Sequence, residues 1–299
     1  MRAEQIAKAI GTTHRSGKWW RCICPVHGSR TGDSTTLAVR DGDRGLIVVC
    51  HAGCRAADVM AELRKRALVG SSTAVERAAA APSSDNRSDT ASRIASARRV
   101  WDRTQGALGT PVQAYFLGRG LEIARFPCLR YAPSLRRPDG SYGPAMVAPV
   151  LDLKGRLLGV HRTWLEQDDA GTWRRRDRAT LGPIRGGAVQ LAPATPQLMV
   201  GEGVESSAAP MQATGIPAWA ALSTSGLKSL ILPPLVQHVI ILADNDGSGA
   251  GQHAAQQAAH RWIAEGRRVQ ITMPLDTGTD MADVLVGRAP MTEAHYVAA

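Results

Sequence analysis

Two aspartates in the last third of the chain follow directly on a run of apolar residues. The run is 239–243, and Asp244 and Asp246 come next, in a turn rich in glycine. Residues two positions apart in an extended segment point the same way, so both carboxylates can face one point. Two such charges about 4 Å apart repel by roughly 4 kcal/mol at an effective dielectric near 20. A divalent cation removes this repulsion, and oxygen ligands favour Mg²⁺ or Mn²⁺.

The apolar run has the pattern of a buried strand in a parallel sheet, because polar and apolar residues do not alternate in it. Residues 252–265, rich in alanine and glutamine, follow as the predicted crossover helix. The aspartates then lie at the carboxyl end of a strand, where open α/β sheets bind their ligands. The neighbouring glycines let the backbone approach a phosphate closely. The alternative is a solvated turn, which Asp-Asn-Asp-Gly also favours.

A second acid follows another short apolar run. Glu202 stands between Gly201 and Gly203, after residues 197–200 and before a predicted helix over 204–213. Two strand ends of one predicted α/β domain thus carry acids beside glycine. This pattern, over residues 196–287, resembles the toprim domain, which is named for topoisomerases and primases. In that family a strand-end glutamate is followed later in the chain by Asp-x-Asp.

The resemblance implies a role for each acid. Asp244 and Asp246 would bind the metal, and Glu202 would act as an acid/base group or as a further ligand. Glu205 lies one turn after Glu202 and is a secondary candidate for the same metal cluster. Two more candidates, Asp280 and Asp283, lie in a segment that resembles the late acidic element of the domain. A cap at the start of a helix explains these last two equally well.

Cysteines are concentrated near the start of the chain, with four of the five between residues 22 and 54. Clustered cysteines without an export signal favour a metal site over disulfides. Cys24 and His27 form one pair, and Cys50 and Cys54 form the other. Together they supply the four nitrogen and sulfur ligands of a structural Zn²⁺ site, which leaves no open position for water. Two further candidates, Cys22 and His51, are not assigned to the set.

Between the two pairs, residues 34–40 and 45–49 read as a hairpin, which is the plan of a zinc ribbon. This segment resembles the primase-type zinc-binding domain, and most closely the versions in phage and plasmid primases. A helix is predicted to follow over residues 55–68, with Ala56, Val59, Met60 and Leu63 on one face.

The length of 299 residues allows two or three domains. We expect a zinc ribbon over 1–69, a flexible linker over 70–92 with a short helix at 74–81, an α+β middle region over 93–195, and an α/β toprim domain over 196–299, with a mostly parallel sheet flanked by helices. In the middle region we expect helices at 94–104 and 112–118 and strands at 145–153, 157–164 and 188–191. Residues 115–121 resemble a segment near the start of primase catalytic cores.

The chain is strongly basic, with a formal net charge of +10, which favours a polyanionic partner. The densest basic run is 173–178, in which Arg174, Arg175 and Arg176 are candidate contacts for template or triphosphate phosphates. Arg162 and Arg185 are further candidates. The alternative for each is an arginine in a solvated loop. No apolar run is long enough to span a membrane, and the first residues do not form a secretory signal, so we expect a cytoplasmic protein.

Together the two resemblances imply a DNA primase of the phage or plasmid type. Such an enzyme would make short RNA primers on single-stranded DNA from ribonucleoside triphosphates by Mg²⁺-dependent nucleotidyl transfer. The chain shows no P-loop motif, so a replicative helicase would act in trans. Two alternatives stay open, a toprim metal-dependent nuclease and a non-catalytic module that binds or loads single-stranded DNA.

Overall fold

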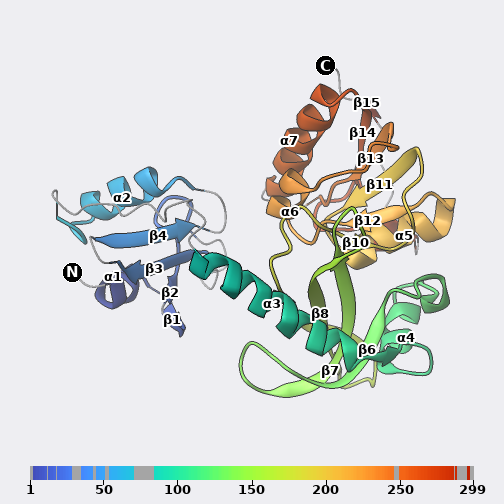
Figure 1. The fold of residues 1–299 in the computed structure, drawn as a ribbon, viewed down its shortest axis with the longest axis horizontal. Helices are drawn as coiled ribbons and strands as arrows, with labels where there is room; N and C mark the ends of the chain where they lie inside the picture. Colours follow the sequence, from blue (N-terminus) through green and yellow to red (C-terminus); the bar gives the residue numbers. More distant parts are fainter. Residues whose placement is uncertain are drawn as a thin grey trace. The chain divides into compact units, whose positions relative to one another are not determined.

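The computed structural model describes residues 3–11, 13–17, 19–28, 35–42, 45–50, 54–70, 84–245, 249–285, 287 and 295–296. The chain divides into two compact units, Met1–Ser83 and Ser84–Ala299, which are described separately (Figure 1).

The first unit contains a four-stranded antiparallel sheet in the order β1-β2-β3-β4. Its strands are Thr13–Ser16, Trp19–Cys22, Leu37–Asp41 and Leu46–Cys50. The helices α1 (Ala3–Ile10) and α2 (Ala56–Lys65) pack against it, and Ile6, Leu37, Met60 and Leu63 are fully buried in their shared core. The predicted hairpin is β3 and β4, and the predicted helix is α2, with Val59, Met60 and Leu63 buried as expected.

The second unit begins with α3 (Ser84–Asp102), so residues 84–92 are helical and do not form part of a linker. The polar composition of residues 84–92 gave no sign of a helix. The helix packs against the core further along, where Ala97 is fully buried in a cluster with Val147 and Val160. Tertiary packing of this kind, rather than local propensity, accounts for most helix stability in proteins. Residues 71–83, including the predicted helix at 74–81, lie outside the described part of the chain.

A five-stranded antiparallel sheet follows, in the order β5-β6-β7-β8-β9. Its strands are Gln105–Gly106, Arg130–Arg136, Tyr142–Leu151, Leu157–Gln167 and Trp173–Leu181. The helix α4 (Pro111–Leu117) and the 3₁₀ turn η1 (Ile123–Arg125) lie between β5 and β6. The basic run, whose alternative reading was a solvated loop, is instead part of β9. Its arginines carry no apolar alternation, which is the signal that identifies a strand in a sequence.

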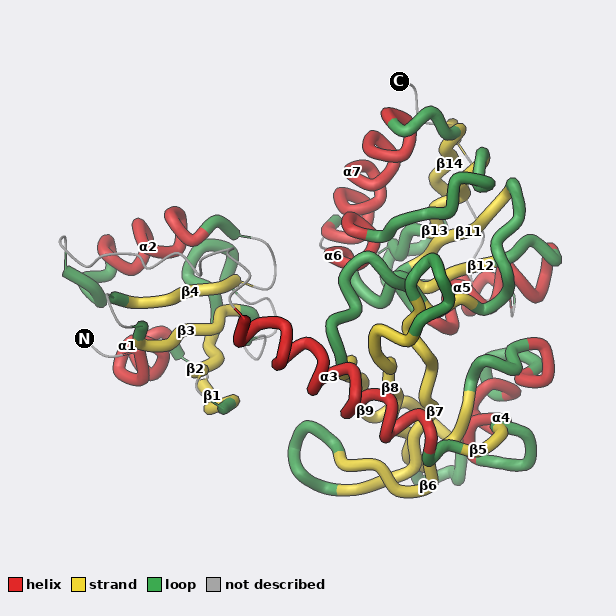
Figure 2. Tube along the Cα trace, viewed as in Figure 1, coloured by secondary structure: helices red, strands yellow, loops and turns green. Residues whose placement is uncertain are grey.

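The last sheet has six strands in the order β10-β12-β11-β13-β14-β15. They are Val189–Gln190, Ala218–Ala220, Gln197–Gly201, His238–Leu242, Arg268–Thr272 and His295–Tyr296. The four central strands are parallel and the edge strands β10 and β15 are antiparallel. The predicted mostly parallel sheet is therefore confirmed (Figure 2).

Helices cover both faces of this sheet. The helices α5 (Val204–Thr214) and α8 (Met281–Leu285) pack together on one face, and α6 (Thr224–Ser229) and α7 (Ala250–Ala264) pack together on the other. Val239 and Ile241 of β13 belong to the core under α7, and Leu242 belongs to the opposite core. The strand is thus buried from both sides. Pro210 lies inside α5, which starts at Val204.

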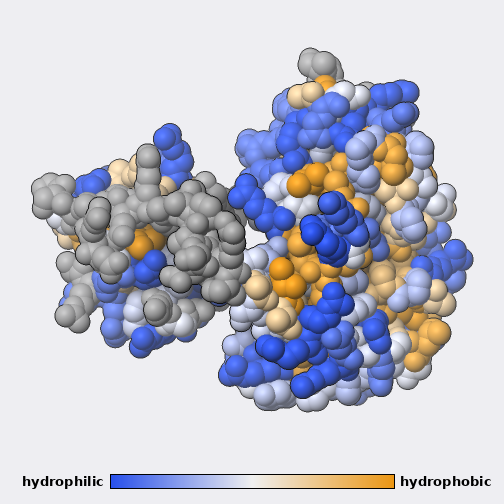
Figure 3. Space-filling view, in the orientation of Figure 1, coloured by the Kyte–Doolittle hydropathy of each residue, from blue (hydrophilic) through white to orange (hydrophobic). Residues whose placement is uncertain are grey.

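Hydrophobic residues gather in the middle of the visible face of Ser84–Ala299, between hydrophilic margins (Figure 3). Among the described residues, no helix is long and apolar enough to cross a membrane.

Candidate active site

Four side chains of the first unit converge as the sequence predicts. The ligand atoms of Cys24, His27, Cys50 and Cys54 all lie within 4.8 Å of one another. Cys24 follows β2, Cys50 ends β4, and Cys54 precedes α2, while a turn closed by the Gly28 N–H on the Cys24 carbonyl at 2.9 Å presents His27. His27 Nδ1 lies 3.1 Å from the Cys54 sulfur. Such separations are close to those between the ligands of a tetrahedral zinc ion.

The donor set fits a structural zinc ion. Burial first, and then the neighbouring thiols of Cys50 and Cys24, raise the pKa of Cys54 to about 12, so the cluster disfavours thiolates unless a cation compensates them. His27 Nε2 lies 3.1 Å from Thr36 Oγ1, an outer contact of the kind that fixes the ring and leaves Nδ1 for a metal. Cys22 is buried and is not a member of the group. His51 lies outside the described residues.

Glu202 and Asp244 meet at one edge of the parallel sheet. Glu202 follows β11 and Asp244 follows β13, and these strands are direct neighbours with Gly201 opposite Leu242. Both acids line a pocket of about 260 Å³, together with Arg178, Gly203, Leu222, Ser223 and Thr224. Leu222 holds a left-handed backbone with φ 70°, an unfavourable conformation for a residue with a side chain, and donates its N–H to the Glu202 carbonyl at 2.8 Å. Asp246 lies outside the described residues.

Asn245 holds the loop that carries Asp244. Its side-chain Nδ2 donates to the carbonyls of Pro274 and Leu275, each at 3.0 Å, and its Oδ1 accepts from Gln252 at 3.2 Å. The middle residue of Asp-Asn-Asp thus joins the loop after β13 to the loop after β14. This role of Asn245 could not be predicted from the sequence, because the partners of its side chain are distant in the chain.

Asp280 and Asp283 lie in a second pocket, of about 210 Å³, that Asp244 also lines. Asp280 Oδ1 accepts from the backbone N–H groups of Ala282 and Asp283, and Asp283 Oδ2 accepts from the N–H of Asp280. This reciprocal pair caps the start of α8, so the helix-cap interpretation is confirmed. Asp280 and Asp283 cap the helix and also line the same pocket as Asp244.

Glu205 turns away from these acids. It is almost fully buried, its Oε1 accepts a hydrogen bond of 2.7 Å from the Tyr115 hydroxyl, and it lines neither pocket that contains Asp244. Burial alone would raise the pKa of Glu205, but the Tyr115 hydroxyl, a backbone N–H and the charges of Arg175 and Arg119 lower it below the usual value. The hydrogen bond thus links Glu205 of α5 to Tyr115 of α4, away from the two pockets that Asp244 lines.

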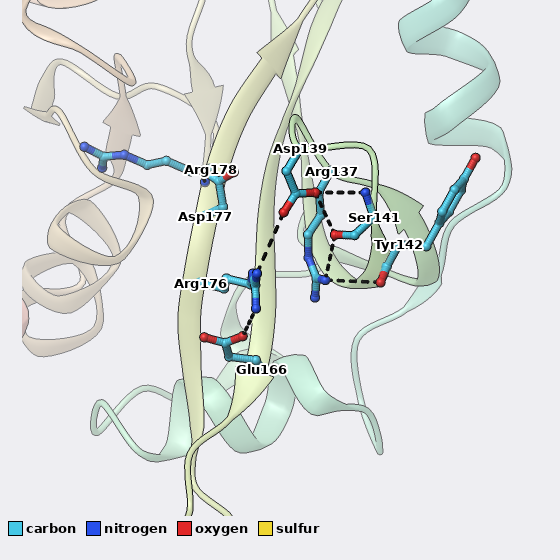
Figure 4. Close-up of polar contacts among 8 residues, drawn as sticks. All are labelled: Arg137, Asp139, Ser141, Tyr142, Glu166, Arg176, Asp177 and Arg178. Carbon is cyan, nitrogen blue, oxygen red and sulfur yellow. Dashed lines mark hydrogen bonds and ion pairs between the residues drawn. The ribbon is translucent and has the colours of Figure 1, made fainter. Parts of the chain in front are cut away.

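Two of the candidate arginines are paired with acids in β8 and in the turns next to it and to β6. Arg176 contacts Glu166 at 2.7 Å and Asp139 at 3.8 Å, as Figure 4 shows, and Arg174 contacts Asp168 at 3.0 Å. Asp139 is itself held by the Ser141 N–H and hydroxyl. These pairs are exposed, and they place the side chains of Arg174 and Arg176 on local carboxylates rather than in the pocket of Glu202.

Arg178 is the residue of the basic run that lines the pocket with Glu202 and Asp244. Residues two apart in a regular strand point to the same face, yet Figure 4 shows Arg178 and Arg176 pointing in opposite directions. The register explains this, because Trp164 pairs with Asp177 and Leu165 with Arg175, which leaves Arg176 as an extra residue in a bulge. Nothing in the order of these residues indicates the bulge, so Arg178 was not among the predicted site residues.

The other candidate arginines lie at separate places. Arg162 stacks over Trp164 with 5.0 Å to the ring centroid and donates to the Thr180 carbonyl at 3.2 Å. Arg175 lines a pocket of about 200 Å³ with Tyr115 and Arg119. Arg185 lines a further pocket, of about 800 Å³, together with Lys228 and Arg261.

Two family matches cover most of the second unit. Residues 91–191 match a domain of unknown function, DUF7146, and residues 197–290 match the Toprim domain. A comparison with curated proteins gives no match.

Several solved structures are similar to the chain. The Aquifex aeolicus primase, with its zinc-binding and RNA polymerase domains, is 16% identical, and the match covers 98% of this chain and 84% of that one with a TM-score of 0.44. A DNA primase domain from Pseudomonas aeruginosa is 18% identical over 66% of this chain and 74% of that one, with a TM-score of 0.42. The E. coli primase catalytic core is 18% identical over 67% and 75%, with a TM-score of 0.42. With its central parallel strands, its Glu202 and Asp244 at adjacent strand ends and its family match, the segment 197–290 is a Toprim domain.

Proposed function

We propose that this protein is a DNA primase, which joins ribonucleoside triphosphates into short RNA primers on single-stranded DNA. The observation that carries the proposal is the shared pocket of Glu202, Asp244 and Arg178 at the strand ends of a Toprim domain. Two carboxylates and a guanidinium at one pocket are suited to a metal-bound, negatively charged phosphate substrate.

The residues fit a divalent cation. Carboxylate oxygens from two neighbouring strand ends face a pocket with room for water, as Mg²⁺ requires because it keeps several of its waters. Asp244 and Glu202 would hold the ion, and Asp246 would join them. When bound, Mg²⁺ supplies charge neutralisation at the phosphates and lowers the pKa of the attacking 3′-hydroxyl.

The chain's own residues would then divide the work. Arg178 would contact the triphosphate, and Glu202 would hold the proton that leaves the 3′-hydroxyl. Asn245 would keep Asp244 in place through its contacts with the loop after β14. The zinc module would hold the template strand, and a helicase would act in trans. The protein would act in the cytoplasm and would be encoded by a phage or a plasmid.

The test is a primer assay with labelled ribonucleotides, Mg²⁺ and single-stranded DNA, repeated with each nucleotide withheld in turn. We expect short oligomers, which Asp244→Asn and Asp246→Asn abolish. Nicking of supercoiled DNA without nucleotides would instead favour a nuclease. A loading module would be favoured if the wild-type protein makes no oligomers and if Asp244→Asn leaves the binding of single-stranded DNA unchanged.

A further inference from the structure

The buried carboxylate of Glu205 lies three residues after Glu202 and takes no part in the proposed cation site. It is in the first turn of α5, and it accepts its hydrogen bond from the hydroxyl of Tyr115, which is buried in α4. Burying a carboxylate is costly, and an apolar residue would pack here without that cost. A hydrogen bond has a direction, however, and therefore fixes the first turn of α5 more narrowly than apolar packing would.

The first turn of α5 determines where Glu202 lies, because only Gly203 separates Glu202 from the helix. Gly203 is the N-cap residue, and no side chain caps the helix there. Glycine also gives the backbone between Glu202 and α5 more conformational freedom than any other residue would. The Tyr115 hydroxyl thus provides, from another helix, the side-chain anchor that the N-cap lacks.

Other contacts hold α5 and α8 against the same segment. In the last turn of α5, Gln212 donates to the Gly120 carbonyl and accepts from the Glu122 N–H, each at 2.8 Å. Arg119 donates to Asp280 at the start of α8. The segment 115–122 therefore contacts both ends of α5 and the start of α8, the helices that follow Glu202 and Asp280.

We propose that Tyr115 is a positioning residue for the cation site of the Toprim domain. Its hydroxyl, through Glu205, holds the first turn of α5 so that the Glu202 carboxylate stays in the pocket with Asp244. The inference rests on the cation site that the proposed function includes. It gives the middle region a part in that site, because Tyr115 lies outside the Toprim match of residues 197–290.

Two other roles for Glu205 make different predictions. A carboxylate that attracts the cation by its charge, or binds it directly, needs the negative charge and not the Tyr115 hydroxyl. A positioning contact needs the hydrogen bond and not the charge. Two isosteric changes separate these cases, because Tyr115→Phe removes the donor and keeps the charge, whereas Glu205→Gln keeps an acceptor oxygen and removes the charge.

The experiment measures the Mn²⁺ affinity of the full chain, prepared with zinc, by electron paramagnetic resonance without nucleotide or DNA. The Toprim cation site is the part of the binding that Asp244→Asn abolishes. We expect Tyr115→Phe to weaken this site about 3- to 10-fold, less than the roughly 10- to 100-fold for a group that touches a metal ligand directly, because Tyr115 acts through Glu205. Glu205→Gln should bind Mn²⁺ about as tightly as the wild type.

The matched control is Thr104→Val, which removes another buried hydroxyl and its hydrogen bond of 2.7 Å to the Trp101 carbonyl. Thr104 lies between α3 and β5. The control should therefore lower stability and leave the Mn²⁺ affinity of the folded protein unchanged. Circular dichroism under the same conditions shows that each variant is folded when its affinity is measured.

Wild-type Mn²⁺ affinity in Tyr115→Phe would overturn the inference. So would a loss in Glu205→Gln or in Thr104→Val as large as the loss in Tyr115→Phe, and so would binding that Asp244→Asn does not change. A protein that makes no primer but binds Mn²⁺ less tightly as Tyr115→Phe would lose the proposed function and keep this inference. Conversely, a protein whose primer synthesis depends on Asp244, but whose Tyr115→Phe variant binds Mn²⁺ normally, would keep the function and lose the inference.

Discussion

The Nη2 of Arg119 donates a hydrogen bond of 2.7 Å to Oδ2 of Asp280, a residue 161 positions further along the chain. The other oxygen of the same carboxylate caps α8. One side chain of the late acidic segment thus anchors its own helix and ties it to the end of α4. Burial disfavours the charge on Arg119, but Asp280 and its neighbours outweigh this and raise the pKa of the guanidinium.

Replacing Arg119 by glutamine should destabilise the protein by about 1 to 2 kcal/mol, because a partly buried charge-assisted hydrogen bond is lost. Urea unfolding of the two proteins gives the difference. The matched control is Arg125→Gln, whose partner Glu122 is as exposed as Arg125 itself, so that pair should contribute nothing measurable. Equal effects of both changes would show that the contact with Asp280 has no special weight.

Tyr115→Phe should lower stability by about 1 to 3 kcal/mol at neutral pH, because it leaves the buried Glu205 carboxylate without its hydroxyl donor. In the wild type the pKa of Glu205 is lowered in the folded state, so its contribution is present above the unfolded pKa and is lost as pH falls. The variant lacks one of the groups that lower this pKa, so the folded-state pKa of Glu205 rises towards its unfolded value. The deficit should therefore shrink in acid, as unfolding curves at neutral and acidic pH will show. Tyr142→Phe, at an exposed tyrosine, is the control.

His161 predicts a second pH dependence. Burial, and then the positive charges of Arg178, Arg162 and Arg175, lower its pKa from 6.5 to about 4, against the opposing charge of Glu205. Between pH 4 and 6.5, His161 is therefore protonated in the unfolded chain but neutral in the folded protein. Stability should thus fall as the pH drops from 6.5 towards 4, by up to about 3 kcal/mol.

The check is a histidine NMR titration together with unfolding across this pH range. His161→Gln should flatten the dependence, whereas His253→Gln, on the exposed side of α7, should leave it as it is. An NMR pKa near 6.5 for His161 would contradict the prediction.

Chelation should remove zinc from the N-terminal unit and unfold it, because the four ligands connect the ends of β2 and β4 to the start of α2. Metal analysis should find about one zinc per chain, which Cys54→Ser abolishes. Cys22→Ser changes a buried cysteine outside the cluster and should retain the metal. Loss of zinc in both variants would mean that the assigned ligand set is incomplete.

Arg178→Gln should reduce nucleotidyl transfer about 100-fold at saturating nucleotide, the effect expected from removing a cation aimed at a reacting phosphate. Arg176→Gln removes the same charge two positions away, from a side chain occupied by Glu166 and Asp139, and should leave the rate nearly unchanged. The measurement is the rate of primer synthesis by the two variants. Similar rates would show that Arg178 does not contact the reacting phosphate.

Local pattern was sufficient for much of the fold and of the site. The apolar runs before Glu202 and Asp244 identify β11 and β13 because a buried parallel strand is apolar on both faces. The spacing of Cys24, His27, Cys50 and Cys54 identifies the metal cluster because two ligand pairs on either side of a hairpin converge.

What the sequence missed depends on distant contacts. The direction of Glu205 is set by Tyr115 on another helix, 90 residues away. The position of Arg178 depends on a bulge between β8 and β9, and no residue in either strand signals it. The start of α3 at Ser84 was missed because polar residues there carry no periodicity.

The spacing of Glu202 and Asp244 comes from the backbone ladder between β11 and β13, in which Gly201 is opposite Leu242. Homologous proteins can therefore exchange the aliphatic side chains that pack on the sheet and still keep both carboxylates at the same separation. An insertion of a single amino acid in either strand would be far less tolerable, since every later side chain would swap faces and one acid would be carried out of the pocket.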